Sequence, residues 1–119
     1  KILGPQRMLL ISDSMSATGL DDGEYILGGL KVIVKDSVAR TEYGAIAGST
    51  KNLMQMLRSA VSFGVSLEQA VEMASLTPAR AAGIDREVGS IEEGKAADMV
   101  WIDPDLSIRA VIFKGKIIS

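Results

Sequence analysis

The sequence predicts an α/β protein, and three observations support this prediction. Residues 8–11 form a continuous apolar run without alternation, which is typical of a strand buried on both faces of a parallel sheet. Residues 53–61 carry apolar side chains at helical spacing. Beyond residue 88, short apolar stretches separated by glycine turns predict a β-rich part. The chain has 119 residues, about the size of one small domain.

The composition excludes several classes of function. The net charge is -2 and no basic run occurs, so nucleic acid and anionic membranes are not expected partners. No apolar run of about 18 residues is present, so no transmembrane helix is predicted. The absence of Cys excludes disulfides and thiolate chemistry, which fits a cytoplasmic location. The absence of His excludes a Ser-His-Asp triad and any His-bearing zinc site made by this chain alone.

The first predicted strand ends at a polar corner, and a second β element follows it. Residues 12–14 terminate the apolar run, and residues 18–25, rich in Gly and Asp, predict a loop. Residues 27–44 predict a β-hairpin because apolar and polar side chains alternate along them. The pair Asp36–Ser37 is the predicted tight turn of that hairpin.

Three helices are predicted next. The first lies within residues 47–64 and is capped by Ser49 or Thr50. The second begins after Ser66, which opens a capping box. A short third helix restarts at a Thr-Pro pair and ends at Gly83.

The pattern changes near residue 85. We therefore predict two parts, an α/β part over residues 1–85 and a β part over residues 86–119. The β part is too short to bury a core alone, so we expect it to pack against other chain. Its predicted strands are residues 97–102, 108–113 and 116–118, with Lys114–Gly115 at the last turn.

The start of the sequence predicts the end of a helix. Residues 1–3 are followed by Gly4 and Pro5, a typical helix stop. A chain that opens on a helix end is expected to be a piece of something larger.

Asp13 is the first candidate for chemistry. It follows a buried-type strand directly, and catalytic groups of α/β barrels lie at the carboxyl ends of strands. A carboxylate there can take a proton from water and return it to a leaving group. The alternative, favoured when Asp13 is considered alone, is that it caps the following turn.

Two further segments combine glycines with polar residues. The segment "IAGST", residues 46–50, precedes a predicted helix, and Gly48 permits close approach of a ligand to the backbone. Taken alone, the segment is better explained as an ordinary capped helix start. The segment "GSIEEGKAADMVWID", residues 89–103, is interpreted as a structural hairpin without convergent polar groups.

Taken together, these pieces carry a resemblance to a known family. The string "DGEYILGGLKVIVKDSVAR", followed by "IAGST" and "ASLTPARAAG", closely resembles the carboxyl-terminal part of the N-acetylglucosamine-6-phosphate deacetylases, within the amidohydrolase superfamily. The resemblance covers nearly the whole chain. It implies the carboxyl-terminal portion of a (β/α)8 TIM-like barrel plus the carboxyl-terminal strands of a small β-sandwich. Residues 8–11 would be the last barrel strand, and most of the barrel would lie outside this chain.

The resemblance also implies roles for particular residues. Asp13 matches the family's acid, the general base towards water and then the general acid towards the departing amine. Ala47, Gly48 and Ser49 match the substrate-contacting loop near the N-acetyl group. A divalent metal, zinc or iron, would be held by one Glu and two His outside this chain, so no metal ligand is assigned here. The amino-sugar phosphate is the implied ligand and a homodimer the implied assembly.

The chain departs from the family pattern at one point, and two alternative functions also fit the sequence. The family usually shows Thr-Asp-Ala where this chain has Ser12–Asp13–Ser14, so the acid is retained among changed neighbours. One alternative is another amidohydrolase, a dipeptidase or a deaminase. The other is a non-catalytic binding or assembly domain that stands alone. Because the implied metal ligands are absent, we expect this chain by itself to be inactive.

Overall fold

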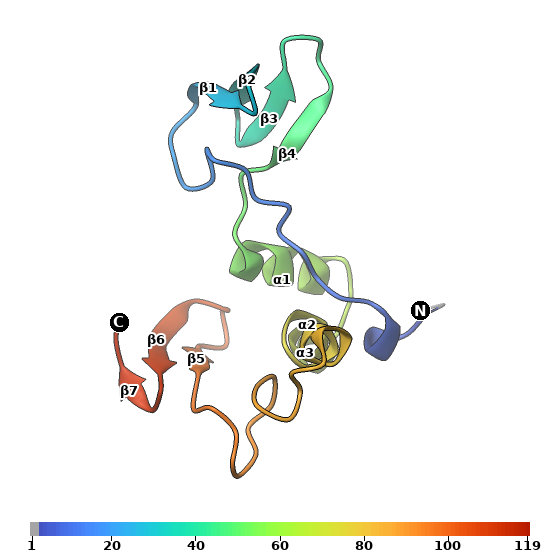
Figure 1. Cartoon of the computed structure of the whole chain (residues 1–119), viewed down its shortest axis with the longest axis vertical. Helices are drawn as coiled ribbons and strands as arrows, with labels where there is room; N and C mark the ends of the chain where they lie inside the picture. Colours follow the sequence, from blue (N-terminus) through green and yellow to red (C-terminus); the bar gives the residue numbers. More distant parts are fainter. Residues whose placement is uncertain (1–2) are drawn as a thin grey trace. The chain divides into compact units, whose positions relative to one another are not determined.

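The computed structural model describes residues 3–119, which fall into two compact units (Figure 1). One unit is Leu10–Ala60, and the other joins the residues up to Leu9 with Val61–Ser119. No helix among the described residues is long and apolar enough to cross a membrane. The boundary predicted between residues 85 and 86 stays a prediction.

The unit Leu10–Ala60 is built on a four-stranded antiparallel sheet in the order β1-β2-β3-β4. Residues 18–25 were predicted to form a loop, but β1 begins at Gly23 and pairs with β2 along its whole length. The hydrogen bonds of that pairing outweigh the low strand preference of Gly23 and Glu24. The strands are β1 (Gly23–Leu27), β2 (Leu30–Lys35), β3 (Val38–Thr41) and β4 (Ile46–Ser49).

The predicted hairpin is confirmed as β2 and β3, joined by Asp36–Ser37. Both turn residues have positive φ, 52° and 60°, the backbone that a two-residue hairpin turn requires. The Asp22 carboxylate accepts hydrogen bonds from the N–H groups of Asp36 (2.7 Å) and Ser37 (3.4 Å). The turn backbone is therefore satisfied by a side chain from the segment before β1.

One face of this sheet carries a small core. Val32 and Val34 on β2 and Ala39 on β3 are buried, while the alternate residues of β2 are exposed, as period two requires. Met15 and Ala17, from the loop before the sheet, complete the buried cluster. Tyr25, Leu27 and Ala47 pack against it.

The strand predicted at residues 8–11 is not formed. Within the described part of the chain no strand pairs with these residues, and Met8, Leu9 and Ile11 are 42%, 43% and 64% exposed. The physical reason is that a parallel strand needs neighbours for its hydrogen bonds, and both described sheets are antiparallel. The apolar run is present, but residues 3–119 supply no strand that pairs with it.

Helix α1 (Leu53–Ser62) begins later than predicted. Its cap is Asn52, whose Oδ1 accepts from the Gln55 N–H (3.0 Å) while Gln55 Oε1 accepts from the Asn52 N–H (2.8 Å). This reciprocal capping box replaces the expected cap at Ser49 or Thr50. Ser49 cannot serve because it is the last residue of β4.

The helices of the other unit follow the prediction closely. Ser66 caps α2 (Leu67–Ala74) by accepting from the Gln69 N–H at 3.3 Å. Helix α3 (Leu76–Ala82) starts slightly before the predicted Thr-Pro pair and ends, as predicted, at Gly83 in the left-handed conformation.

A short 3-10 helix, η1 (Pro5–Arg7), packs against α2 and α3. The buried hydroxyl of Thr77 donates to the Pro5 carbonyl at 3.0 Å and fixes this contact. The helix end predicted at residues 1–3 falls mostly outside the described residues. Gly4 has φ 72° and directly precedes η1, so the predicted helix stop stays a prediction.

The last strands form a three-stranded antiparallel sheet in the order β5-β6-β7 (Figure 1). The predicted turn Lys114–Gly115 is confirmed, with both residues at positive φ, and Asp98 accepts from the Lys114 N–H at 2.7 Å. Several large apolar side chains of this sheet are exposed, Trp101 and Ile117 among them. The strands are β5 (Met99–Ile102), β6 (Ile108–Phe113) and β7 (Lys116–Ile117).

Candidate active-site segment around Asp13

The loop that holds Asp13 is joined to the end of β4 by a parallel bridge. Ser14 pairs with Ser49, an isolated contact outside the named ladders. The Ser49 N–H donates to the Asp13 carbonyl at 2.8 Å, and the Met15 N–H donates to the Ser49 carbonyl at 3.0 Å. The structure thus brings the predicted acid next to the segment 47–49, although 35 residues separate the bridged serines.

Asp13 has an uncommon backbone. Its φ is 49°, in the left-handed region that costs a residue with a Cβ about 1–2 kcal/mol, although Asp tolerates it better than most. Its side chain is exposed and makes no hydrogen bond or ion pair with any residue among 3–119. The carboxylate is therefore positioned by the backbone alone, and its oxygens are available to a ligand or a water.

Gly48 occupies a position where a side chain does not fit. Its φ is 131°, which residues with a Cβ rarely adopt, and a Cβ there would lie 3.3 Å from the Asp13 carbonyl oxygen. The same Cβ would lie 3.4 Å from the Met15 Cβ. Glycine is thus required by both backbone conformation and close approach, so Gly48 is fixed to the Asp13 segment by packing.

Ala47 lies at a β-bulge. The register between β3 and β4 passes from Ala39 opposite Gly48 to Arg40 opposite Ile46, so Ala47 is the extra residue. A bulge bends the strand and re-aims its side chains, and bulges are frequent next to active sites. Ala47 packs against the core of the unit, which anchors the bulged segment.

Most polar groups of Ser49 make hydrogen bonds within the protein. Its N–H bonds to Asp13, its carbonyl accepts from Met15, and its hydroxyl oxygen accepts from the Lys51 N–H at 3.0 Å. No residue in the described part of the chain accepts the hydroxyl hydrogen of Ser49. The Ser49 hydroxyl can therefore donate a hydrogen bond to a ligand.

Sequence reasoning missed the hydroxyl groups that hold these segments together. Ser14 donates to the Lys51 carbonyl at 2.9 Å, and Thr18 donates to the Ser49 carbonyl at 3.0 Å. The only signal in the sequence is the density of Ser and Thr in both segments. Their pairing spans 37 and 31 residues, so no local pattern could have indicated it.

The residues present do not form a metal site. The described residues contain no group of three or more His, Cys, Asp or Glu side chains that could hold an ion, and the chain has no His. Asp13 is one carboxylate without a second ligand beside it. This chain's own donor set therefore does not fit a divalent metal.

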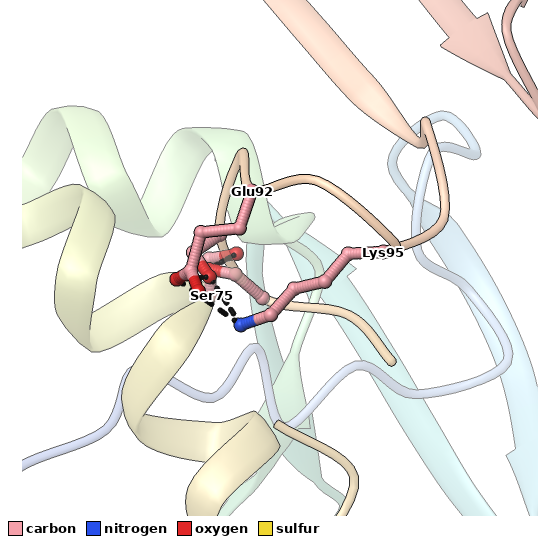
Figure 2. Close-up of polar contacts among 5 residues, drawn as sticks. Ser75, Glu92 and Lys95 are labelled. Carbon is pink, nitrogen blue, oxygen red and sulfur yellow. Dashed lines mark hydrogen bonds and ion pairs between the residues drawn. The ribbon is translucent and has the colours of Figure 1, made fainter. Parts of the chain in front are cut away.

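The segment after α3 does contain convergent polar groups, contrary to the prediction (Figure 2). The Lys95 ammonium lies 2.6 Å from the Ser90 hydroxyl and 3.2 Å from Glu92 Oε1, and Ser90 also donates to Glu92 at 2.6 Å. The Lys95 side chain is only 11% exposed. Ser75, between α2 and α3, donates to the Gly89 carbonyl at 3.0 Å. These contacts are structural. The Ser75 hydrogen bond fixes Gly89 to the end of α2, and the contacts of Lys95 close the segment 90–95 on itself.

The charge state of Glu92 reflects this cluster. The pKa of Glu92 is lowered. The hydrogen bond from Ser90 is the largest cause, and the hydrogen bond and the charge of Lys95 lower the pKa further. Each stabilises the ionised carboxylate relative to the protonated form.

Comparison with known proteins identifies the family. Residues 7–118 match the model of the Amidohydrolase family. The chain belongs to the amidohydrolase family. The resemblance inferred from the sequence motifs is thereby confirmed at this level.

Individual relatives of this amidohydrolase chain carry deacetylase names. It is 43% identical over 113 residues to the N-acetylglucosamine-6-phosphate deacetylase of Vibrio furnissii, covering 94% of this chain and 28% of that protein. It is 39% identical over 115 residues to the putative N-acetylgalactosamine-6-phosphate deacetylase of Escherichia coli K12, covering 96% of this chain and 69% of that protein.

Solved structures agree with these sequence relatives. The amidohydrolase chain superposes with TM-score 0.89 on the N-acetylglucosamine-6-phosphate deacetylase of Thermotoga maritima, at 38% identity over 95% of this chain and 31% of the other. For the enzyme of Mycobacterium smegmatis the TM-score is 0.88, at 40% identity over 98% of this chain and 32% of the other. The chain spans less than a third of the length of these proteins.

We predict that Gly48→Ala destabilises the unit Leu10–Ala60 by about 2–3 kcal/mol, because the added methyl group pushes against the Asp13 carbonyl in a strained backbone. The matched control is Gly44→Ala, since Gly44 also has positive φ but a Cβ there meets no atom within 4 Å. The control should cost about 1 kcal/mol. Urea unfolding followed by far-ultraviolet circular dichroism measures the free energy of unfolding of both variants. Equal losses of stability in the two variants would contradict the steric account.

We predict that Lys95→Met and Ser90→Ala each raise the pKa of Glu92 towards its ordinary value of 4.5. Because the folded pKa lies below the unfolded one, the cluster stabilises the fold above about pH 4.5 and loses this effect as pH falls through the lowered pKa. Carboxyl NMR titration of Glu92 measures the shift. Lys116→Met, which removes an equivalent charge from β7, is the control and should leave the Glu92 titration unchanged.

Proposed function

We propose that this amidohydrolase chain contributes the acid–base carboxylate and a substrate-contacting segment to an enzyme that hydrolyses the N-acetyl amide of N-acetylglucosamine 6-phosphate. The products are glucosamine 6-phosphate and acetate. The observation that supports this most is the bridge that holds the exposed Asp13 carboxylate beside Gly48 and Ser49. The deacetylase names of relatives at up to 43% identity support the reaction class.

Asp13 is proposed to move the proton. An amide is a poor electrophile and an amine a poor leaving group, so water must be deprotonated as it attacks and the nitrogen protonated as it departs. One carboxylate can do both in turn, taking the proton from water and returning it to the amine. No side chain among residues 3–119 contacts the Asp13 carboxylate, so both of its oxygens are available for these transfers.

The segment 47–49 is proposed to contact the substrate near its acetyl group. Gly48 presents backbone without a side chain, and the free hydroxyl hydrogen of Ser49 can donate to an oxygen of the substrate. Ala47, the extra residue of the bulge, belongs to the same segment. The fold holds this segment from one side by the Asp13 loop and from the other by β3.

Amidohydrolases are generally metal-dependent, and the metal would polarise the carbonyl and acidify the attacking water. We propose zinc or iron, held by ligands outside these 119 residues. We also propose a (β/α)8 barrel that includes residues 1–85, a β-sandwich that includes residues 86–119, a homodimer and a cytoplasmic location. The high structural similarity to deacetylases over nearly the whole chain supports the barrel.

A second candidate substrate is N-acetylgalactosamine 6-phosphate. Two Escherichia coli relatives at 39% identity carry that substrate in their names. The two sugars differ only in the configuration of one ring hydroxyl, so the same acetyl chemistry serves both. The glucosamine compound is preferred because the Vibrio furnissii relative has the higher identity, 43%.

We predict that a chimera in which residues 7–118 replace the matching segment of the Vibrio furnissii relative deacetylates N-acetylglucosamine 6-phosphate. Acetate release is measured with both sugar phosphates, free amino acid with a dipeptide, and ammonia with a nucleobase amine. Higher kcat/KM for the galactosamine compound would select the second candidate. Activity on only the dipeptide or the nucleobase would select the other amidohydrolase reactions.

We predict that Asp13→Asn lowers kcat of this chimera by about 100- to 10,000-fold, because the amide cannot accept the proton from water. Asp21→Asn is the matched control, since Asp21 is another exposed loop acid and should change kcat less than about twofold. The isolated 119-residue chain, assayed beside them with zinc or iron, should be inactive. Full activity of the Asp13→Asn chimera would refute the proposed role of Asp13.

A further inference from the structure

The Ser49 carbonyl joins the Asp13 loop to β4 through hydrogen bonds. It accepts two hydrogen bonds, from the Met15 N–H at 3.0 Å and from the Thr18 hydroxyl at 3.0 Å. A carbonyl oxygen has two lone pairs, so both are used. The second hydrogen bond is partly buried, so it is electrostatically stronger than an exposed one.

Thr18 is also tied to the other end of the same loop. Its N–H donates to the Met15 carbonyl at 2.9 Å and closes the turn that follows Asp13. Met15 and Ala17, both within the turn, are buried in the core of the unit. Thr18 therefore connects a turn that is anchored in the core to the strand end that carries the segment 47–49.

The position of the Asp13 carboxylate depends on this connection. The carboxylate has no side-chain partner among residues 3–119, so nothing holds it except its backbone. That backbone is in a left-handed conformation with φ 49°, which persists only where surrounding contacts enforce it. The contacts that do so are the bridge to Ser49 and the turn that Thr18 closes.

We propose that Thr18 is a positioning residue for Asp13. Its hydroxyl fixes the Ser49 carbonyl and so sets the place of the carboxylate relative to the segment 47–49. The inference rests on the proposed function, because it assigns Thr18 a part in the same proton transfer. A displacement of about 1 Å at a reacting group can cost about 100-fold in rate, so even partial loosening of the bridge is measurable.

The test uses the Vibrio furnissii chimera with three variants. Thr18→Val keeps the shape and removes the donor, and it should lower kcat about tenfold while KM changes less than about twofold. Thr18→Ser restores the hydroxyl and should recover kcat to within about threefold of the parent. Thr50→Val is the matched control, because the Thr50 hydroxyl also donates to a backbone carbonyl, that of Ser37, at 2.6 Å. It should leave kcat within about twofold.

The outcomes separate this inference from the proposed function. If Asp13→Asn abolishes activity but Thr18→Val lowers kcat no more than Thr50→Val, the positioning role is overturned and the proposed function stands. If Asp13→Asn is fully active, the proposed function fails and the role of Thr18 fails with it. Should the Thr18→Val chimera not fold, Thr18→Ala takes its place, and an unchanged kcat there overturns the role equally. A loss shared between kcat and KM would indicate general damage and also contradicts the proposal.

Discussion

The structure of the unit Leu10–Ala60 depends on one interaction, the parallel bridge between Ser14 and Ser49. β4 is the last strand of its sheet, so one of its edges would present unpaired N–H and C=O groups without this contact. The bridge satisfies the Ser49 groups on that edge and brings Met15 and Ala17 onto the core face of the sheet. The same contact therefore covers a strand edge, completes a small core and sets the place of Asp13.

The bridge also accounts for the backbone of Asp13 and for the glycine at position 48. Asp13 has a left-handed backbone, and Gly48 has a φ of 131° with the Asp13 carbonyl close above it. Each conformation is unfavourable by itself for a residue with a side chain. The hydrogen bonds of Ser49, and those of the Ser14 and Thr18 hydroxyls, stabilise both positions. Strain of this kind, held by a surrounding hydrogen-bond network, is common where side chains must be presented for chemistry.

The sequence predicted those features that are encoded locally. The turn Asp36–Ser37, the cap Ser66 and the stop Gly83 each follow from the conformational preference of the residue itself. The strand expected at residues 8–11 is not formed. Its apolar pattern specifies burial, and burial needs neighbours that the described residues do not provide. For the site, Asp13 could be singled out by its place after an apolar run. Its contact with the segment 47–49 could not, because it joins residues about 35 positions apart through backbone groups that every sequence possesses.

The central claim is that the Asp13 loop and the end of β4 are joined by backbone hydrogen bonds. The most direct measurement is NMR of the isotopically labelled 119-residue chain, detecting scalar couplings across hydrogen bonds. The account predicts couplings from the Ser49 amide nitrogen to the Asp13 carbonyl carbon and from the Met15 amide nitrogen to the Ser49 carbonyl carbon. Hydrogen exchange at both amides should be slowed like that of the β2–β3 pairs, which serve as the internal reference. Protected β2–β3 amides beside freely exchanging Ser49 and Met15 amides, with no coupling between them, would contradict the account.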